Sequence, residues 1–314
     1  MNRRDGLIVY ILVVCTLLAG WMSRAAENFS GTWTIEHSDE PGKVEFALIH
    51  HQHGNSSSHE SAWPLSVFVG LDVSKPGKQE VKFTITRDAG RLDCEGFVNN
   101  GEGAGVFHFV ADPKFPSEMN SLGFVGIDEE KQYSMAVLDV SLNFAKEMKG
   151  EHLQGLDTDK LIAFRIFNVN SGFIRELRDA GISVTDCDKL VALRIHGVTP
   201  EMVRFLHKSG YQPSEDDLIA MRIHGATPEY IQELQKEGYE HVQLDKLIAF
   251  RIHGVSPEFI QKVQSLGYKH PEPDQLIAMR IHGVTPEYIS GLKSRGMQNL
   301  SIDQLVSLRI QGID

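Results

Sequence analysis

The stretch Asp274–Ile289 reads Asp-Gln-Leu-Ile-Ala-Met-Arg-Ile-His-Gly-Val-Thr-Pro-Glu-Tyr-Ile, and its pattern recurs through the C-terminal half of the chain. Its leucine recurs at spacings of 29, 28, 29, 29 and 29 residues, at Leu161, Leu190, Leu218, Leu247, Leu276 and Leu305. An arginine follows each leucine four residues later, at Arg165, Arg194, Arg222, Arg251, Arg280 and Arg309. A period of this length, kept this regularly, predicts a repeat architecture.

Each repeat contains the signals of two short helices. The second helix begins with a hydroxyl residue, a proline and a glutamate, which suit the N-cap, the first helical position and the positive end of the helix dipole. The N-cap residues are Thr199, Thr227, Ser256 and Thr285. A glycine followed by tyrosine then ends the helix, as at Gly238-Tyr239, because glycine readily takes the left-handed C′ conformation.

The first helix carries Leu-Ile-Ala-x-Arg-Ile and ends at His-Gly in four copies. It is apolar on most sides, so we expect it to be the inner, buried helix. Two such helices cannot cover their own apolar faces, and stacking on neighbouring repeats would do so. Residues 156–314 are therefore predicted to form an α-solenoid, and residues 112–155, with Phe115 and Phe144 at the repeat period, to form degenerate capping repeats.

The N-terminal half has a different period. Residues 27–111 alternate between apolar and polar positions, which predicts a small antiparallel β domain, either a sandwich or a partial barrel. The expected strands are Gly31–His37, Lys43–His50, Ala62–Gly70, Glu80–Arg87, Arg91–Val98 and Gly105–Val110. Asp88-Ala89-Gly90 and Asn99-Asn100-Gly101 are typical of tight turns. The fold class expected for the chain is thus β + α.

Residues 1–26 have the features of a signal peptide. Arg3 and Arg4 precede an apolar run of 16 residues, Leu7–Met22, and small residues follow at Ala25 and Ala26. We expect cleavage there and export to the periplasm or the extracellular space. The alternative is an uncleaved inner-membrane anchor formed by residues 7–22, although this run is shorter than the roughly 20 residues of a typical span.

Charge and cysteine content narrow the classes of function. Residues 27–155 hold 20 acids and 10 bases, and residues 156–314 hold 21 acids and 18 bases, so neither part has the basic surface that nucleic acids require. Only Cys94 and Cys187 follow the signal segment, which excludes a disulfide framework. They either form one bridge or remain two buried thiols.

Few residues suggest chemistry. His51, His53 and His59 could share a metal across a hairpin tip, but no cysteine or well-placed acid completes the ligand set, and a solvated polar tip is the favoured interpretation. The histidines of successive repeats cannot share a metal, because packed helices lie about 8–10 Å apart. No complete catalytic motif is present, so we expect a protein without enzymatic activity and without a cofactor.

The repeated arginines allow two interpretations. In the first, they form a structural ladder with the repeated acids of the second helices, Glu201, Glu229, Glu258 and Glu287, because an unpaired buried charge is expensive. In the second, they form an exposed stripe that grips acidic groups of a partner.

The phrase Leu-Ile-Ala-x-Arg-Ile-His-Gly-Val-Thr-Pro-Glu-Tyr-Ile resembles repeats appended to some bacterial membrane metallopeptidases of the beta-lactam-sensor, antirepressor type. It also resembles repeats of stand-alone exported bacterial proteins. The resemblance covers roughly residues 80–314. The chain lacks the zinc motif and the multi-span membrane domain of the peptidases. No catalytic residue therefore carries over, and the resemblance implies a sensory or interaction role outside the cytoplasm.

These observations predict an exported interaction, scaffold or sensory module that binds a protein or a cell-envelope component through its helical repeats. Contact with the membrane is expected only through an uncleaved N-terminal anchor. The alternative is a carrier of a small ligand or a metal, held in the β domain. A filled β core with a continuous exposed stripe on the helices would favour the module, and a roomy apolar cavity in residues 27–111 would favour the carrier.

Overall fold

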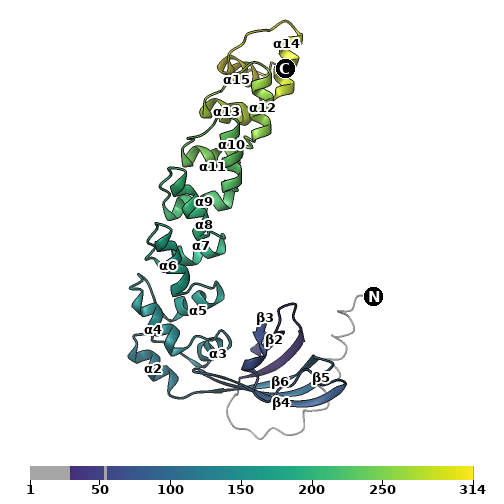
Figure 1. Cartoon of the computed structure of the whole chain (residues 1–314), viewed down its shortest axis with the longest axis vertical. Helices are drawn as coiled ribbons and strands as arrows, with labels where there is room; N and C mark the ends of the chain where they lie inside the picture. The colour runs from purple at the N-terminus through teal and green to yellow at the C-terminus, as the bar shows by residue number, and fades with distance from the viewer. Residues whose placement is uncertain (1–28, 53–54, 314) are drawn as a thin grey trace. The chain divides into compact units, whose positions relative to one another are not determined.

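The computed structural model describes residues 29–52 and 55–313, with only the backbone described at the hairpin tip around 51–57 (Figure 1). The predicted signal segment lies outside the described residues. Within them, no helix is both long and apolar enough to span a membrane. The chain divides into two compact units, one reaching to Gly150 and including Leu156–Ile166, the other made of Glu151–Gly155 and the chain from Phe167 onward. We call them unit 1 and unit 2 and describe each separately.

Unit 1 begins with an antiparallel sheet in the order β3-β2-β1-β6-β5-β4. The strands are β1 (Ser30–His37), β2 (Lys43–Gln52), β3 (Asn55–Pro64), β4 (Lys78–Arg87), β5 (Gly90–Asn99) and β6 (Glu102–Ala111). The predicted β domain is confirmed, and both expected tight turns are present. Asn100 and Gly101 have φ angles of 51° and 86°, as a two-residue hairpin turn with two left-handed residues requires.

The third strand differs from its prediction. The expected strand Ala62–Gly70 is wrong for most of its length, because Leu65–Val67 form a 3-10 turn, η1, directly after Pro64. The observed β3 is the polar stretch before it, paired to β2 with His59 opposite Leu48. It lies at the edge of the sheet, where its polar side chains can face solvent while its backbone pairs on one side only.

The sheet curls around one aromatic core. The ring centres of Trp33 on β1 and Phe83 on β4 lie 5.1 Å apart, and those of Phe46 on β2 and Phe83 lie 6.2 Å apart. Neither β1 nor β2 neighbours β4 in the sheet. Trp33 is fully buried, and its indole N–H donates to the carbonyl oxygen of Val106 at 3.1 Å. Gly105 makes room for it, since a Cβ there would lie 2.7 Å from the indole. Of the two predicted forms, the domain is therefore a partial barrel with a filled interior.

The helices that follow belong to the same unit. They are α2 (Phe115–Ser121), α3 (Glu129–Val137), α4 (Leu142–Gly150) and α5 (Thr158–Ile166). Gln132 of α3 donates to the carbonyl oxygens of Ala89 and Asp112 at 2.8 and 2.7 Å, and Tyr133 packs parallel to Phe107 of β6. The stretch that was predicted to hold degenerate repeats is thus helical, and α3 fastens it to the sheet.

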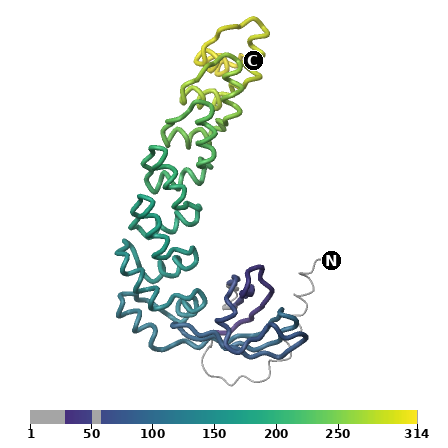
Figure 2. The backbone as a smooth tube through the Cα atoms, in the orientation of Figure 1, coloured from purple at the N-terminus to yellow at the C-terminus, as the bar shows by residue number. Residues whose placement is uncertain are grey.

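Unit 2 consists of two rows of short helices, which Figure 2 traces as hairpins stacked one upon the next. The first-helix row comprises α7 (Cys187–Ile195), α9 (Glu215–His224), α11 (Leu244–His253), α13 (Pro273–Ile281) and α15 (Ile302–Ile310). The second-helix row comprises α6 (Ser171–Asp179), α8 (Pro200–Lys208), α10 (Pro228–Lys236), α12 (Pro257–Ser265) and α14 (Pro286–Ser294). Neighbouring helices of the first-helix row contact one another, and in the second-helix row α6 contacts α8, α8 contacts α10 and α12 contacts α14, as stacked repeats should.

The predicted helix signals are confirmed in unit 2. The side chains of Thr199, Thr227, Ser256 and Thr285 accept hydrogen bonds from backbone N–H groups three residues later. Gly238 has a φ of 94°, and the N–H of Tyr239 returns to the carbonyl oxygen of Leu234 at 3.0 Å. The ring of Tyr239 is buried, and its hydroxyl donates to Pro271 of the next repeat.

The prediction that the first helix, being apolar on most sides, would be the inner, buried helix is wrong. In α13 the fully buried side chains are Leu276 and Met279, whereas Ile281 is 53% exposed. At 100° per residue, Leu276 and Met279 face the same side and Ile281 faces nearly the opposite side. The neighbouring repeats cover one side of this row and leave the other side to solvent.

Candidate functional site

The repeated arginines, which we call the arginine column, connect successive repeats; they are Arg165, Arg194, Arg222, Arg251, Arg280 and Arg309. The guanidinium Nε of Arg222, Arg251 and Arg280 donates to the carbonyl oxygen of the histidine that ends the first helix of the preceding repeat, at 3.0, 3.4 and 3.2 Å. Arg165 makes the equivalent bond to Leu138 in unit 1, at 2.8 Å. A helix C-terminus leaves carbonyl groups without intrahelical partners, and a cation is a favourable partner for them.

The same arginines lie over aromatic rings of the preceding second helix. Arg194 lies 3.6 Å from the ring centre of Phe173, Arg251 4.8 Å from Tyr230, Arg280 5.1 Å from Phe259 and Arg309 4.9 Å from Tyr288. Arg222 is the exception, because Met202 takes the place of the ring. These are cation–π contacts between repeats.

The glycine of His-Gly serves this contact as well as the helix end. Gly254 has a φ of 73°, which favours glycine, and a Cβ there would lie 2.8 Å from Nη2 of Arg280. At Gly225 the same distance, to Arg251, is 3.2 Å. The motif therefore ends one helix and leaves space for the arginine of the next repeat.

Among the described residues, the glutamates expected to pair with the arginines form no ion pair with them. Glu201 pairs with Arg204 at 2.6 Å, and Glu258 pairs with Lys262 at 2.7 Å, both on their own helices. Hydrogen bonds from its own backbone N–H and from Thr227 lower the pKa of Glu229, and the charge of Arg222 adds to this lowering. Backbone carbonyls and aromatic rings therefore take the role that was predicted for these acids. Because the arginines are only half-buried or exposed, they do not need an acid as a partner.

The most repetitive exposed feature of unit 2 is a set of isoleucines, which we call the isoleucine stripe. They occupy the same position in the last turn of each first helix and are 54, 55, 53, 53 and 62% exposed. The residues are Ile195, Ile223, Ile252, Ile281 and Ile310. One turn earlier, each helix carries a half-buried isoleucine or valine, as at Ile219 and Ile248. Sequence reasoning placed all these residues in the core.

An aspartate row runs along the N-terminal edge of the same helices. Its members are exposed in every repeat of unit 2, at Asp188, Asp216, Asp245, Asp274 and Asp303. Lys189 pairs with Asp216, and Lys246 pairs with Asp274, in each case across a repeat boundary. In α9 an acid, Asp217, stands at the position of these lysines.

Of the three histidines predicted as possible metal ligands, the structure describes only the side chain of His59. His53 lies outside the described residues, as does the side chain of His51. His59 was expected after a hairpin loop, but it lies within β3, half-buried beside Ser61 and Trp63, and burial lowers its pKa. Among the residues that the structure describes, no three His, Cys, Asp or Glu side chains are placed to hold a metal. Sequence reasoning missed that His50 is buried and stacks on Phe29.

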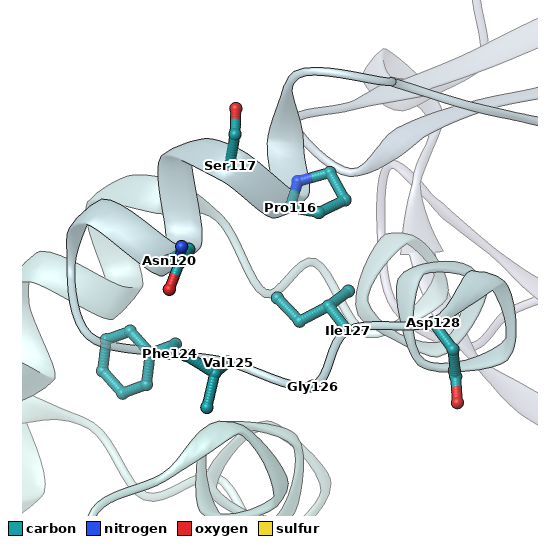
Figure 3. Close-up of a pocket in the computed structure, with 8 residues that line it drawn as sticks. All are labelled: Pro116, Ser117, Asn120, Phe124, Val125, Gly126, Ile127 and Asp128. Atoms are coloured by element: carbon teal, nitrogen blue, oxygen red, sulfur yellow. The ribbon is translucent and has the colours of Figure 1, made fainter.

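The two cysteines and a surface depression lie outside the repeats' exposed features described above. Cys94 and Cys187 are buried and form no disulfide with each other, and burial raises the pKa of Cys94 well above its usual range. A depression of about 740 Å³ opens to solvent beside α2 (Figure 3). It is lined by Pro116, Ser117, Asn120, Phe124, Val125, Gly126, Ile127 and Asp128, outside the β domain. Neither feature brings together groups for catalysis.

No protein-family model matches the chain, and a search of curated proteins finds no significant relative.

Proposed function

We propose that the protein is a non-enzymatic interaction module that binds a protein or a cell-envelope component through the isoleucine stripe. The observation that carries this proposal is the exposure of the stripe, with each of the five isoleucines more than half exposed. Contiguous apolar surface on a soluble protein commonly marks an interaction site. Repeat proteins are suited to this role, because stacking creates long surfaces of nearly constant chemistry.

Packing within the array does not account for the stripe. Leu247 and Phe250 already supply the buried contacts of α11, and Ile252 in the same helix points to solvent. An exposed isoleucine in the last turn gains little from folding, since hydrophobic stabilisation scales with the area removed from water. Its repetition at one position is therefore more consistent with a binding surface.

The arginine column supports the proposal indirectly. Its members contact carbonyl oxygens and rings of the preceding repeat, as a structural ladder would. The alternative in which the arginines bind acidic groups of a partner has less support, because at Arg251 and Arg280 these contacts already engage one face and the Nε of the guanidinium. The isoleucine stripe thus replaces the arginines as the proposed binding surface.

The proposed location is outside the cytoplasm, because of the signal features in residues 1–26 and the resemblance to repeats of sensor-type membrane metallopeptidases. The alternative of a small-ligand or metal carrier has no comparable observation in its favour. Trp33, Phe46 and Phe83 fill the interior of the partial barrel, where that function would need space.

A matched pair of variants tests the proposal. The double variant Ile223→Ser with Ile252→Ser removes two central members of the stripe, and the control Gln232→Ser with Gln261→Ser changes two exposed residues of the second-helix row. Each purified protein is used to capture partners from envelope extract. We expect one set of partners to be captured by the wild type and the control and to be lost with the stripe variant. Equal capture by all three proteins would contradict the proposal.

A further inference from the structure

We infer that the occupant of the isoleucine stripe is an amphipathic α-helix whose apolar face is flanked by lysine or arginine. This inference rests on the proposed function and specifies the partner that the stripe would take. It draws on the width of the stripe, its period and the charge along its edge.

The stripe is two apolar residues wide. In α9 and α11 the pairs Ile219/Ile223 and Ile248/Ile252 are four residues apart, which is about 6 Å along each helix. Ile223 and Ile252 are exposed, and their partners one turn earlier are half-buried. Between the two rows lies a half-buried small residue, Ala220 in α9. An apolar surface with two rows suits an amphipathic helix that lies across the repeats, because the apolar side chains of such a helix also form two rows along its length.

The period of the stripe favours the same occupant. Helices packed side by side lie about 8–10 Å apart, which sets the distance from one isoleucine to the next along the row. Two turns of an α-helix, or seven residues, advance by about 10.5 Å, so its apolar rows meet successive repeats nearly in register. An extended chain returns to the same face after two residues, about 6.6–6.8 Å, and would lose register after one repeat.

The charge along the edge of the isoleucine stripe indicates which kind of amphipathic helix would bind. The aspartate row borders the stripe, and the side chains of Asp216 and Asp274 remain 75% exposed although each pairs with a lysine. In α9 Asp217 replaces that lysine, so Glu215, Asp216 and Asp217 stand together in its first turn. A cationic flank on the occupant would be attracted to this edge, and an anionic flank would be repelled from it. The arginines that precede the stripe isoleucines, Arg222, Arg251 and Arg280, are already held by carbonyl oxygens of the preceding repeat.

Synthetic peptides of three heptads, about 21 residues, test the inference because they would span roughly three repeats. The probe has leucine at the a and d positions and lysine on the flanks. One comparison peptide has glutamate on the flanks, and another has two central prolines that prevent a helix. Calorimetric titration into the purified chain should give saturable binding of the lysine peptide and at least tenfold weaker binding of the other two.

The variants locate the binding. Ile223→Ser with Ile252→Ser should weaken the lysine peptide at least tenfold, Asp216→Asn with Asp245→Asn should weaken it and reduce its salt dependence, and Gln232→Ser with Gln261→Ser should leave it unchanged. Equal binding of the proline peptide would overturn the helical occupant, and equal binding of the glutamate peptide would overturn the charge argument. Stripe-dependent binding to vesicles of anionic lipid would overturn the inference in favour of a membrane.

Failure of this inference is distinguishable from failure of the proposed function. If the lysine peptide does not bind but capture from envelope extract still depends on Ile223 and Ile252, the helical occupant is wrong and the stripe remains the binding surface. If capture does not depend on these residues, both are wrong.

Discussion

At the scale of single residues, Arg251 shows how one repeat holds the next. Its Nε donates to the carbonyl oxygen of His224, and its guanidinium lies over Tyr230. Because Arg251 is exposed, neither contact carries the large penalty of an unpaired buried charge. Its contribution is thus the sum of one charge-assisted hydrogen bond and one exposed cation–π contact.

We predict that Arg251→Ala lowers the free energy of unfolding of the helical repeats by about 1–2.5 kcal/mol, the sum of about 0.5–1.5 kcal/mol for a solvent-exposed hydrogen bond and about 0.5–1 kcal/mol for an exposed cation–π contact. Arg222→Ala should cost less by about 0.5–1 kcal/mol, because Met202 offers no ring. Urea melts followed by circular dichroism measure both changes. Equal losses for the two variants would show that the ring contact contributes nothing.

Gly254 allows a test of the space that the arginine occupies. We predict that Gly254→Ala destabilises unit 2 by about 1–2 kcal/mol from its left-handed backbone alone, and further because the added Cβ meets Arg280. In the Arg280→Ala background only the backbone cost should remain. A double-mutant cycle from urea melts measures the difference, and strictly additive effects would contradict a contact between the two side chains.

At the scale of elements, the second helices are held by their N-termini. Thr199, Thr227 and Thr285 cap the helices, and the acid two residues later accepts bonds from its own N–H and from the threonine, which lowers the pKa of Glu201, Glu229 and Glu287. A lowered folded pKa means that the stabilisation is fully present above the unfolded pKa of about 4.5 and is lost as pH falls through the folded value.

We therefore predict that the urea midpoint of the wild type falls as pH is lowered from neutral to below about 4.5. The triple variant Glu201→Gln, Glu229→Gln and Glu287→Gln should begin from a lower midpoint at neutral pH and change less on acidification. Paired melts across this range measure it. The same pH dependence in both proteins would assign the acid sensitivity to other carboxyl groups.

The elements also show what the sequence could reveal. Thr-Pro-Glu and Gly-Tyr were read correctly because caps and stops depend on neighbours within one turn. β3 was misplaced because an edge strand can be polar, and its identity depends on pairing with β2. The partners of the arginines were missed because a backbone carbonyl has no sequence signature. The exposure of Ile252 was missed because an apolar helix does not indicate which side its neighbours cover.

At the scale of the whole molecule, the two units are built on different principles. In unit 1 the core joins residues far apart in the sequence, such as Trp33 and Phe83. In unit 2 the contacts that define the array join residues 21 to 32 positions apart, as between Arg251 and Tyr230, Lys246 and Asp274, or Tyr239 and Pro271. Repeats of this kind owe their stability to interfaces with their immediate neighbours.

We predict that the exported form of the chain begins at Ala26 or Glu27, because Arg3, Arg4 and the apolar run Leu7–Met22 precede small residues. N-terminal sequencing of protein recovered from the cell envelope checks this. Recovery of the same protein beginning at Met1 in a membrane fraction would favour the anchor, and recovery from cytosol would contradict export.

The missing ring at Met202 also bears on how the array would carry tension. A force applied to the two ends of unit 2 would act on every interface between repeats, because the interfaces are connected in series. The interface at Arg222 has the hydrogen bond to a carbonyl oxygen but lacks an aromatic ring such as those that Arg251 and Arg280 contact. We expect it to yield first in single-molecule force measurements and Met202→Phe to raise the force at which the first extension occurs. Under load, the position of the break would then be set by one methionine.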